Sequence, residues 1–202
     1  MGRADQVVSP FRSKVIILNP LSLTNSLGRM LRRSQPSHLE TYVGTTSASG
    51  LLQHQFLLDA GMTPKSSVLE IGCGALHAGA HVIGFLEADG YVGIEPNDWL
   101  WRERLKDVRV SELVEQKRPI FLARTDFDAS SVGRSFDLIF GHSVLSHASR
   151  TQLPEFLAAA AQTLAPDGKV LASIRLAEGN SFGSIGSPTG GNTNDEEWVY
   201  PG

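Results

Sequence analysis

The segment VLEIGCGALHAG, residues 68–79, joins a short apolar run to two closely spaced glycines. The apolar run is long enough for a buried strand, and the residues after the glycines are compatible with a helix. Glycine lets the main chain turn sharply and lets a ligand approach without meeting a Cβ atom. The segment therefore predicts a strand, a turn that can bind a ligand, and a helix, in that order.

Strand and helix patterns alternate on both sides of this segment. The strand candidates are residues 67–71, 91–94, 119–123, 136–140 and 169–176. Helical patterns occupy residues 49–60, 78–86 and 97–108. A fourth helix, which stops at the turn APDG (residues 165–168), has an apolar stripe expected in the core: Leu153, Phe156, Leu157, Ala160, Ala161 and Leu164. Alternation of this kind implies right-handed crossovers, so the expected fold class is α/β with a doubly wound, mostly parallel sheet.

The composition is that of one globular domain. The chain has 202 residues, of which 41% are hydrophobic and 19% charged, and its formal net charge of -3 gives no general attraction to nucleic acid. Residues 1–40 are expected to form a basic N-terminal arm, disordered or loosely docked. Residues 41–176 are expected to form the ligand-binding domain, and residues 177–202 a Gly- and Ser-rich tail.

Three features bear on location. The apolar run VIILNPL, residues 15–21, is too short to span a bilayer, so no membrane span is expected. The single cysteine, Cys73, cannot form an internal disulfide, which suits a reducing compartment such as the cytoplasm. The Arg- and Ser-rich beginning leaves organelle targeting as the alternative.

Polar residues and glycines follow the predicted strands, where a doubly wound sheet binds its ligands. The motifs are ExGxG at residues 70–74, GIEPN at 93–97, TDFD at 125–128, FDLIFGHSVLSH at 136–147 and LAPDGKVL at 164–171. Their order and spacing resemble those of class I S-adenosylmethionine-dependent methyltransferases over residues 51–176. The resemblance implies a Rossmann-like fold, S-adenosylmethionine as the cofactor, and methyl transfer without a metal.

The resemblance also implies a role for individual residues. Glu70 would hold the amino-acid portion of the cofactor through a hydrogen-bonded network or water, and Glu95 would accept hydrogen bonds from the two ribose hydroxyls. Asp126, or Asp128 as the alternative, would face the adenine amino group. The implied cofactor-contact residues are Glu70, Gly72, Cys73, Gly74, Glu95, Pro96, Asp126, Phe127 and Gly141. From its residue type alone, Cys73 is most often a small buried filler.

His142 and His147 are the candidate catalytic residues. Both follow the fourth predicted strand, and a histidine can take a proton from a hydroxyl or amine acceptor near neutral pH. The alternative role for either is a hydrogen bond at a helix start or a contact with the substrate. The same segment reads GHSV, not the Asn/Asp-Pro-Pro-aromatic motif of methyltransferases that act on adenine or glutamine. A small-molecule acceptor is therefore expected, and nucleic acid is not favoured as a partner.

Two alternatives remain at this point. A nicotinamide-binding Rossmann oxidoreductase would need the fingerprint GxGxxG, but His77 stands where its third glycine should be, and the methyltransferases often have a glycine where Leu76 stands. The other alternative is a truncated cofactor-binding protein without efficient catalysis, because the family usually has two further strands after the fifth. An uncovered fifth strand would favour self-association through its edge, so we expect residues 177–202 or another chain to cover it.

Overall fold

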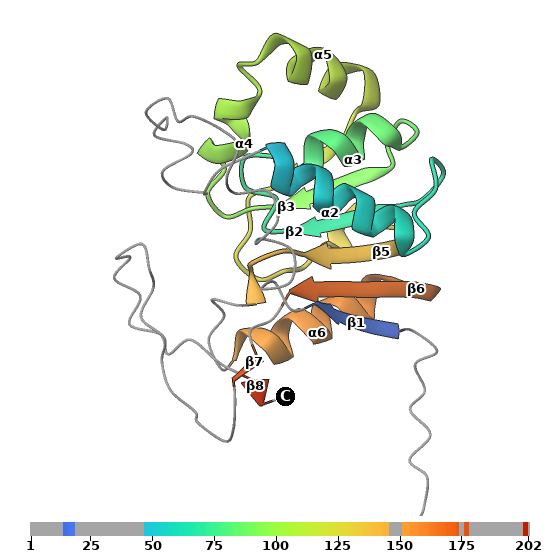
Figure 1. Cartoon of the computed structure of the whole chain (residues 1–202). Helices are drawn as coiled ribbons and strands as arrows, with labels where there is room; N and C mark the ends of the chain where they lie inside the picture. Colours follow the sequence, from blue (N-terminus) through green and yellow to red (C-terminus); the bar gives the residue numbers. More distant parts are fainter. Residues whose placement is uncertain (1–13, 19–46, 146–150, 174–175, 178–199, 202) are drawn as a thin grey trace, which may run out of the picture.

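The computed structural model of the chain describes residues 14–18, 47–145, 151–173, 176–177 and 200–201. Six strands form one sheet in which all neighbours are parallel: β1 (Lys14–Leu18), β2 (Val68–Ile71), β3 (Tyr91–Ile94), β4 (Ile120–Leu122), β5 (Phe136–Gly141) and β6 (Leu164–Ser173). Their order across the sheet is β1-β6-β5-β2-β3-β4 (Figure 1). The expected doubly wound parallel fold is therefore confirmed.

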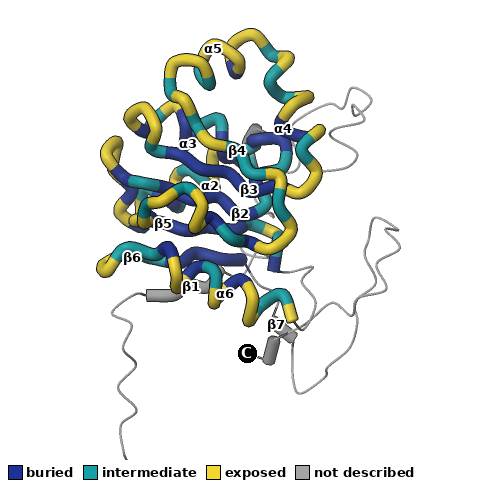
Figure 2. The backbone as a smooth tube through the Cα atoms, turned by 180° about the vertical axis from the view of Figure 1, so that it is seen from behind, coloured by how far each residue is buried: buried dark blue, intermediate teal, exposed yellow. Residues whose placement is uncertain are grey.

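Helices cover both faces of this sheet. The helices are α2 (Ser47–Asp59), α3 (Gly79–Phe85), α4 (Trp99–Arg104), α5 (Val108–Lys117) and α6 (Gln152–Thr163), with a short 3₁₀ helix, η2 (Ser130–Val132). Leu57 of α2 and Val82 of α3 pack with Val68 of β2 on one face. Phe156 and Ala160 of α6 pack against the other face. The central strands β2, β3 and β5 are accordingly largely buried between two helical layers, whereas β4 at the edge of the sheet is partly exposed (Figure 2).

Two local expectations differ from the structure. The segment expected as one helix, residues 97–108, contains only α4, and a second helix, α5, begins at Val108. Asp107 separates the two because its side chain accepts a hydrogen bond from the Arg109 amide and so caps α5. In α6, Leu157 is 42% exposed and Ala161 is also exposed, so the buried stripe is narrower than expected.

The segment APDG lies within β6, where the expectation was a turn before the strand. Phe136 of β5 pairs with Leu164, and Leu138 pairs with Lys169, so four residues of β6 face one residue of β5. The extra residues form an irregularity in the ladder, and regular pairing resumes at Lys169, the residue at which the strand was expected to begin.

The outer edge of β6 is covered by β1. The two strands pair in parallel from Lys14 opposite Lys169 to Leu18 opposite Ser173. The expectation that residues 177–202 or another chain would cover this edge is therefore wrong. The covering strand comes from the segment expected to be a basic arm, and its sequence KVIIL is apolar enough for a strand. The rest of that arm lies outside the described residues.

Two further strands, β7 (Leu176–Ala177) and β8 (Tyr200–Pro201), pair in a separate two-stranded sheet. Within the ranges that the structure describes, the helices are all too short or too polar to cross a membrane.

Candidate functional site

The predicted site residues lie at one edge of the sheet. Strands β5, β2, β3 and β4 are neighbours and run parallel, so their carboxyl ends meet at the same edge. The glycine loop (residues 72–74) follows β2, Glu95 follows β3, Asp126 follows β4, and Gly141 ends β5. Sequence reasoning placed these groups after their strands, and the strand order brings them side by side.

The glycine loop is fastened to the end of β3. Gly72 and Gly74 have positive φ angles of 70° and 48°, which glycine adopts without steric cost. The amides of Gly72 and Cys73 both donate to the carbonyl of Ile94, at 2.8 and 3.1 Å. The Gly74 amide donates to Oε2 of Glu95 at 3.1 Å. Three successive amides of the loop are thus bound by two residues of the neighbouring strand end.

Glu95 connects two loops through its carboxylate. Oε2 accepts the Gly74 amide, and Oε1 accepts the Asn97 amide at 2.9 Å. The side chain is buried, whereas Pro96 beside it is exposed. Each oxygen keeps a lone pair for another donor, because a carboxylate accepts about four hydrogen bonds in total. The carboxylate is therefore held still and can still bind a pair of hydroxyls.

Val144 occupies the space beside Gly72. A Cβ atom at Gly72 would lie 2.4 Å from Cγ2 of Val144, in the loop after β5. A Cβ atom at Gly141 would lie 3.8 Å from Cβ of Val144. The bare backbone of Gly72 is consequently required by this packing between loops, in addition to any ligand that approaches.

Cys73 packs into the core. Its thiol is buried among Leu76, Trp101 and Val110, and a Cβ atom at Gly93 of β3 would lie 2.8 Å from its Sγ. Burial raises the pKa of the thiol well above its usual value. The side chain is therefore a neutral filler, and its main-chain amide is the group that belongs to the glycine loop.

Glu70 is buried in β2 and bonded to the neighbouring strand. The hydroxyl of Tyr91 donates to its Oε2 at 2.5 Å, and a Cβ atom at Gly79 would lie 3.1 Å from the same oxygen. Burial raises the pKa of Glu70 to about 8, although the Tyr91 hydrogen bond opposes the rise. The carboxyl is therefore mostly protonated at neutral pH. It packs against the start of α3 at Gly79.

This buried carboxyl predicts a dependence of stability on pH. Its pKa is 4.5 in ordinary surroundings and about 8 in the fold. Its contribution to stability is therefore fully present below the unfolded pKa and is lost as pH rises through the folded pKa. We expect the melting temperature of Glu70→Gln to fall less than that of the parent between about pH 5 and pH 8. A rise in pKa from 4.5 to about 8 corresponds to roughly 4–5 kcal/mol. Because 1 kcal/mol corresponds to about 2–4 °C for a domain of this size, the two curves should diverge by on the order of 10 °C.

Differential scanning calorimetry across this pH range measures the effect. The glutamine oxygen can still accept the Tyr91 hydroxyl, so the substitution removes the titration and keeps the hydrogen bond. Parallel curves for the two proteins would show that Glu70 does not hold its proton in the fold.

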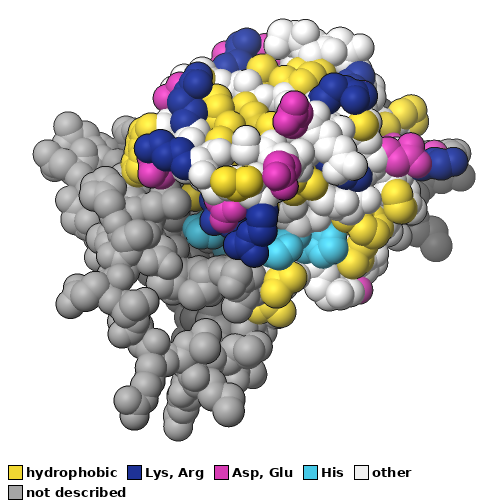
Figure 3. Space-filling view, turned by 90° about the horizontal axis from the view of Figure 1, so that it is seen from above, with side chains coloured by type: hydrophobic (Ala, Val, Ile, Leu, Met, Phe, Trp, Pro, Cys, Tyr) yellow, Lys and Arg dark blue, Asp and Glu magenta, His cyan; other side chains and the backbone are white. Residues whose placement is uncertain are grey.

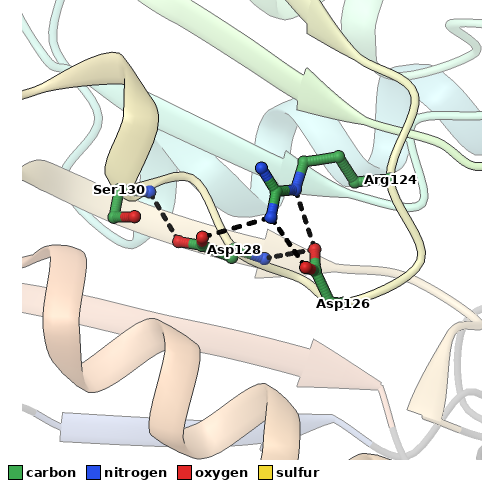
Figure 4. Close-up of polar contacts among 4 residues, drawn as sticks. All are labelled: Arg124, Asp126, Asp128 and Ser130. Atoms are coloured by element: carbon green, nitrogen blue, oxygen red, sulfur yellow. Dashed lines mark hydrogen bonds and ion pairs between the residues drawn. The ribbon is translucent and has the colours of Figure 1, made fainter.

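The residues after β4 form a charged cluster (Figure 4). Arg124 donates from Nε to Oδ1 of Asp126 at 2.8 Å and from Nη2 to Oδ2 at 2.7 Å. The Arg124 hydrogen bond lowers the pKa of Asp126 to about 2, so this carboxylate is ionised. Phe127 has a positive φ of 57° and turns its buried ring toward Phe156 of α6. Asp126 is thereby left facing outward, with 57% of its side chain exposed.

His142 stands directly after β5. Its Nδ1 lies 3.2 Å from Oγ of Ser143, and burial lowers the pKa of its ring. Ser143 has a positive φ of 59°, and its amide donates to Oγ of Ser173 at 2.6 Å. Figure 3 shows histidine side chains gathered beside charged ones on the face seen from above. His147 lies outside the described residues.

Sequence reasoning missed three residues that shape this edge. Tyr91, Arg124 and Val144 were not singled out. The alternation of charges in RTDFD (residues 124–128) could have indicated the Arg124 cluster. In the part of the chain that the structure covers, no group of three or more His, Cys, Asp or Glu side chains could hold a metal ion.

A family profile described as "Methyltransferase domain" matches residues 69–170. The chain belongs to this methyltransferase family. The match begins in β2 and ends in β6, so it contains every candidate site residue from Glu70 to His147. The resemblance found in the sequence is therefore confirmed, and S-adenosylmethionine is the cofactor that membership implies.

Solved structures have the same fold as this methyltransferase domain. The phosphoethanolamine N-methyltransferase 1 of Haemonchus contortus aligns with a TM-score of 0.55 at 12% identity, over 80% of this chain and 35% of that chain. The DhpI–SAH complex aligns at 0.52 and 17% identity, over 76% and 69%. The glycopeptide N-methyltransferase MtfA aligns at 0.50 and 17% identity, over 65% and 56%.

The chain spans about half to three fifths of the length of several of the structures that it matches. A search of curated proteins found no significant match.

Proposed function

We propose that this methyltransferase domain binds S-adenosylmethionine along the carboxyl edge of its sheet and transfers the methyl group to a small-molecule acceptor. The observation that carries the proposal is the Glu95 carboxylate, which the amides of Gly74 and Asn97 hold next to the glycine loop. A fixed carboxylate with free lone pairs suits a pair of vicinal hydroxyls, such as those of a ribose.

The remaining groups fit the other parts of the cofactor. Asp126 is an exposed, ionised acceptor at the end of the adjacent strand, which suits the amino group of adenine. Gly72 and Gly74 have no side chains, and their loop follows β2, which lies between β5 and the strands that Glu95 and Asp126 follow. Glu70 would act indirectly, because its carboxyl is already bonded to Tyr91 and supports α3.

When bound, the sulfonium of the cofactor supplies an electrophilic methyl group. The task of the chain is then to hold the acceptor in line with that group at near-attack distance and to exclude water. His142 is proposed as the group that takes the acceptor's proton. Its lowered pKa leaves the ring neutral at pH 7, and the Ser143 hydroxyl is within reach to orient it.

The acceptor is proposed to be a small molecule. The residues that follow β5 are His142, Ser143 and Val144, in place of the Asn/Asp-Pro-Pro-aromatic sequence typical of methyltransferases that act on adenine or glutamine amides. None of the side chains of residues 142–144 carries the carboxamide or carboxylate with which that sequence begins.

Thermal denaturation with S-adenosylhomocysteine tests the proposal. A ligand that binds only the folded state stabilises it by about 2.7 kcal/mol at 100 times its Kd. We therefore expect a rise of about 5–10 °C in melting temperature. NADH at the same concentration serves as the control and should give no rise. A rise with NADH and none with S-adenosylhomocysteine would overturn the proposal.

A further inference from the structure

Arg124 shares a backbone anchor with Glu95. The carbonyl of Leu122, the last residue of β4, accepts the amide of Glu95 at 3.0 Å and the amide of Arg124 at 3.1 Å. Glu95 and Arg124 therefore follow adjacent strands, and one carbonyl binds the main chain of both. Arg124 is thus part of the edge that carries the proposed cofactor site.

The guanidinium of Arg124 fixes Asp126 in two ways. It binds both carboxylate oxygens with parallel hydrogen bonds, a geometry that sets the plane of the carboxylate as well as its position. Its Nη2 also donates to Oδ2 of Asp128 at 3.3 Å. Figure 4 shows the guanidinium between the two aspartates, with both carboxylates turned toward it.

Asp128 connects this cluster to the start of η2. Its Oδ1 accepts the amide of Ser130 at 2.7 Å, where η2 begins. Between the two aspartates, the ring of Phe127 is buried against Phe156. Asp126 is therefore held from the helix side through Asp128 and Arg124, and from the core through Phe127. Oδ1 of Asp126 also accepts the Asp128 amide at 3.4 Å. One lone pair of the carboxylate, on Oδ2, therefore remains for an outside donor.

A second bidentate Arg–Asp pair lies away from the proposed cofactor site and serves as a comparison. Arg118 binds Asp89 through the same atoms, Nε to Oδ1 at 3.1 Å and Nη2 to Oδ2 at 2.5 Å. That pair precedes β3 and β4, at the amino ends of the strands. Exposed pairs of this kind contribute only about 0–1 kcal/mol to stability. The position of the Arg124 pair, beside Glu95, is what distinguishes it.

We propose that Arg124 is a positioning residue that holds the Asp126 carboxylate in the orientation needed to accept the 6-amino group of adenine, and so sets selectivity against 6-oxo purines. This inference rests on the proposed function. A carboxylate held in place accepts the amino hydrogen of adenine, whereas it faces an oxygen acceptor in a 6-oxo purine. A carboxylate free to rotate can avoid that oxygen, so selectivity would fall.

Isothermal titration with S-adenosylhomocysteine and S-inosylhomocysteine tests the inference. We expect the parent to bind the adenine ligand at least about 10-fold more tightly, in keeping with one hydrogen bond to a charged group. Arg124→Gln should lower this ratio by about 5- to 10-fold, toward 1, chiefly by weakening the adenine ligand. Arg118→Gln, the matched control, should leave the ratio unchanged.

A double-mutant cycle separates positioning from a general structural effect. Asp126→Asn should lower the ratio by itself, and adding Arg124→Gln to it should lower the ratio no further, because Arg124 acts through Asp126. Equal weakening of both ligands by Arg124→Gln, or additive effects in the cycle, would overturn the inference while the proposed function stands. A parent protein that binds neither ligand would overturn both.

Discussion

Replacing Gly72 by alanine is expected to destabilise the fold by about 2–5 kcal/mol. A φ of 70° costs an L-residue with a side chain about 1–2 kcal/mol. The new Cβ would lie 2.4 Å from Cγ2 of Val144, and overpacking of this kind costs about 1–3 kcal/mol. Urea denaturation monitored by tryptophan fluorescence measures the total. Displacement of the loop after β5 should also weaken binding of S-adenosylhomocysteine.

The chain offers a control for each part of this loss. Gly133 has nearly the same φ, 73°, and a Cβ atom there would meet nothing within 4 Å, so Gly133→Ala reports the backbone strain alone. Val144→Ala removes the clashing methyl group, so the double variant Gly72→Ala, Val144→Ala should recover the steric part. An equal loss at Gly72 and Gly133 would show that Val144 does not fill the space beside the loop.

Glu95→Ala is expected to weaken S-adenosylhomocysteine binding by on the order of 1 to 3 kcal/mol, or about 5- to 150-fold. The substitution removes the proposed acceptor for the ribose hydroxyls. It also leaves the amides of Gly74 and Asn97 without their partner, so the glycine loop loses one of its three bonds to the β3 end. Titration calorimetry of the folded variant measures the change in Kd.

Asp137→Ala is the matched control for Glu95. Its Oδ2 accepts the Ser67 amide at 2.8 Å, and this carboxylate–amide bond joins β5 to β2 at the opposite end of the same strands. Its loss should lower the melting temperature and leave affinity unchanged. If Glu95→Ala binds the ligand as tightly as Asp137→Ala does, the cofactor pocket does not include Glu95.

The positions of the central strands, and the motifs that follow them, were predictable from the sequence. Strand β3 matches the expected residues 91–94 because a buried apolar run lies between a glycine and a proline. Signals of this kind are local, since they depend on burial period and turn residues within a few positions.

Partners far apart along the chain could not be predicted in this way. The acid at residue 70 was assigned to the cofactor, and nothing near it indicates that the Tyr91 hydroxyl on the adjacent strand satisfies it. Likewise the run KVIIL has the composition of a strand, but only pairing with a strand near residue 170 places it in the sheet. The partner of a strand across such separations is chosen by tertiary packing, which the local pattern does not encode.

The pairing of β1 with β6 has a consequence for how the molecule is made. Synthesis produces β1 before every other strand of the sheet, and β6 after every other strand. The nascent apolar run at residues 15–18 must therefore wait, without its neighbour, until residue 173 has left the ribosome. Closing a loop of that length lowers the conformational entropy of the chain before the contacts between β1 and β6 can stabilise it. The edge of the sheet is accordingly completed only after residues up to 173 have been synthesised, and until then the apolar run has no strand to pair with.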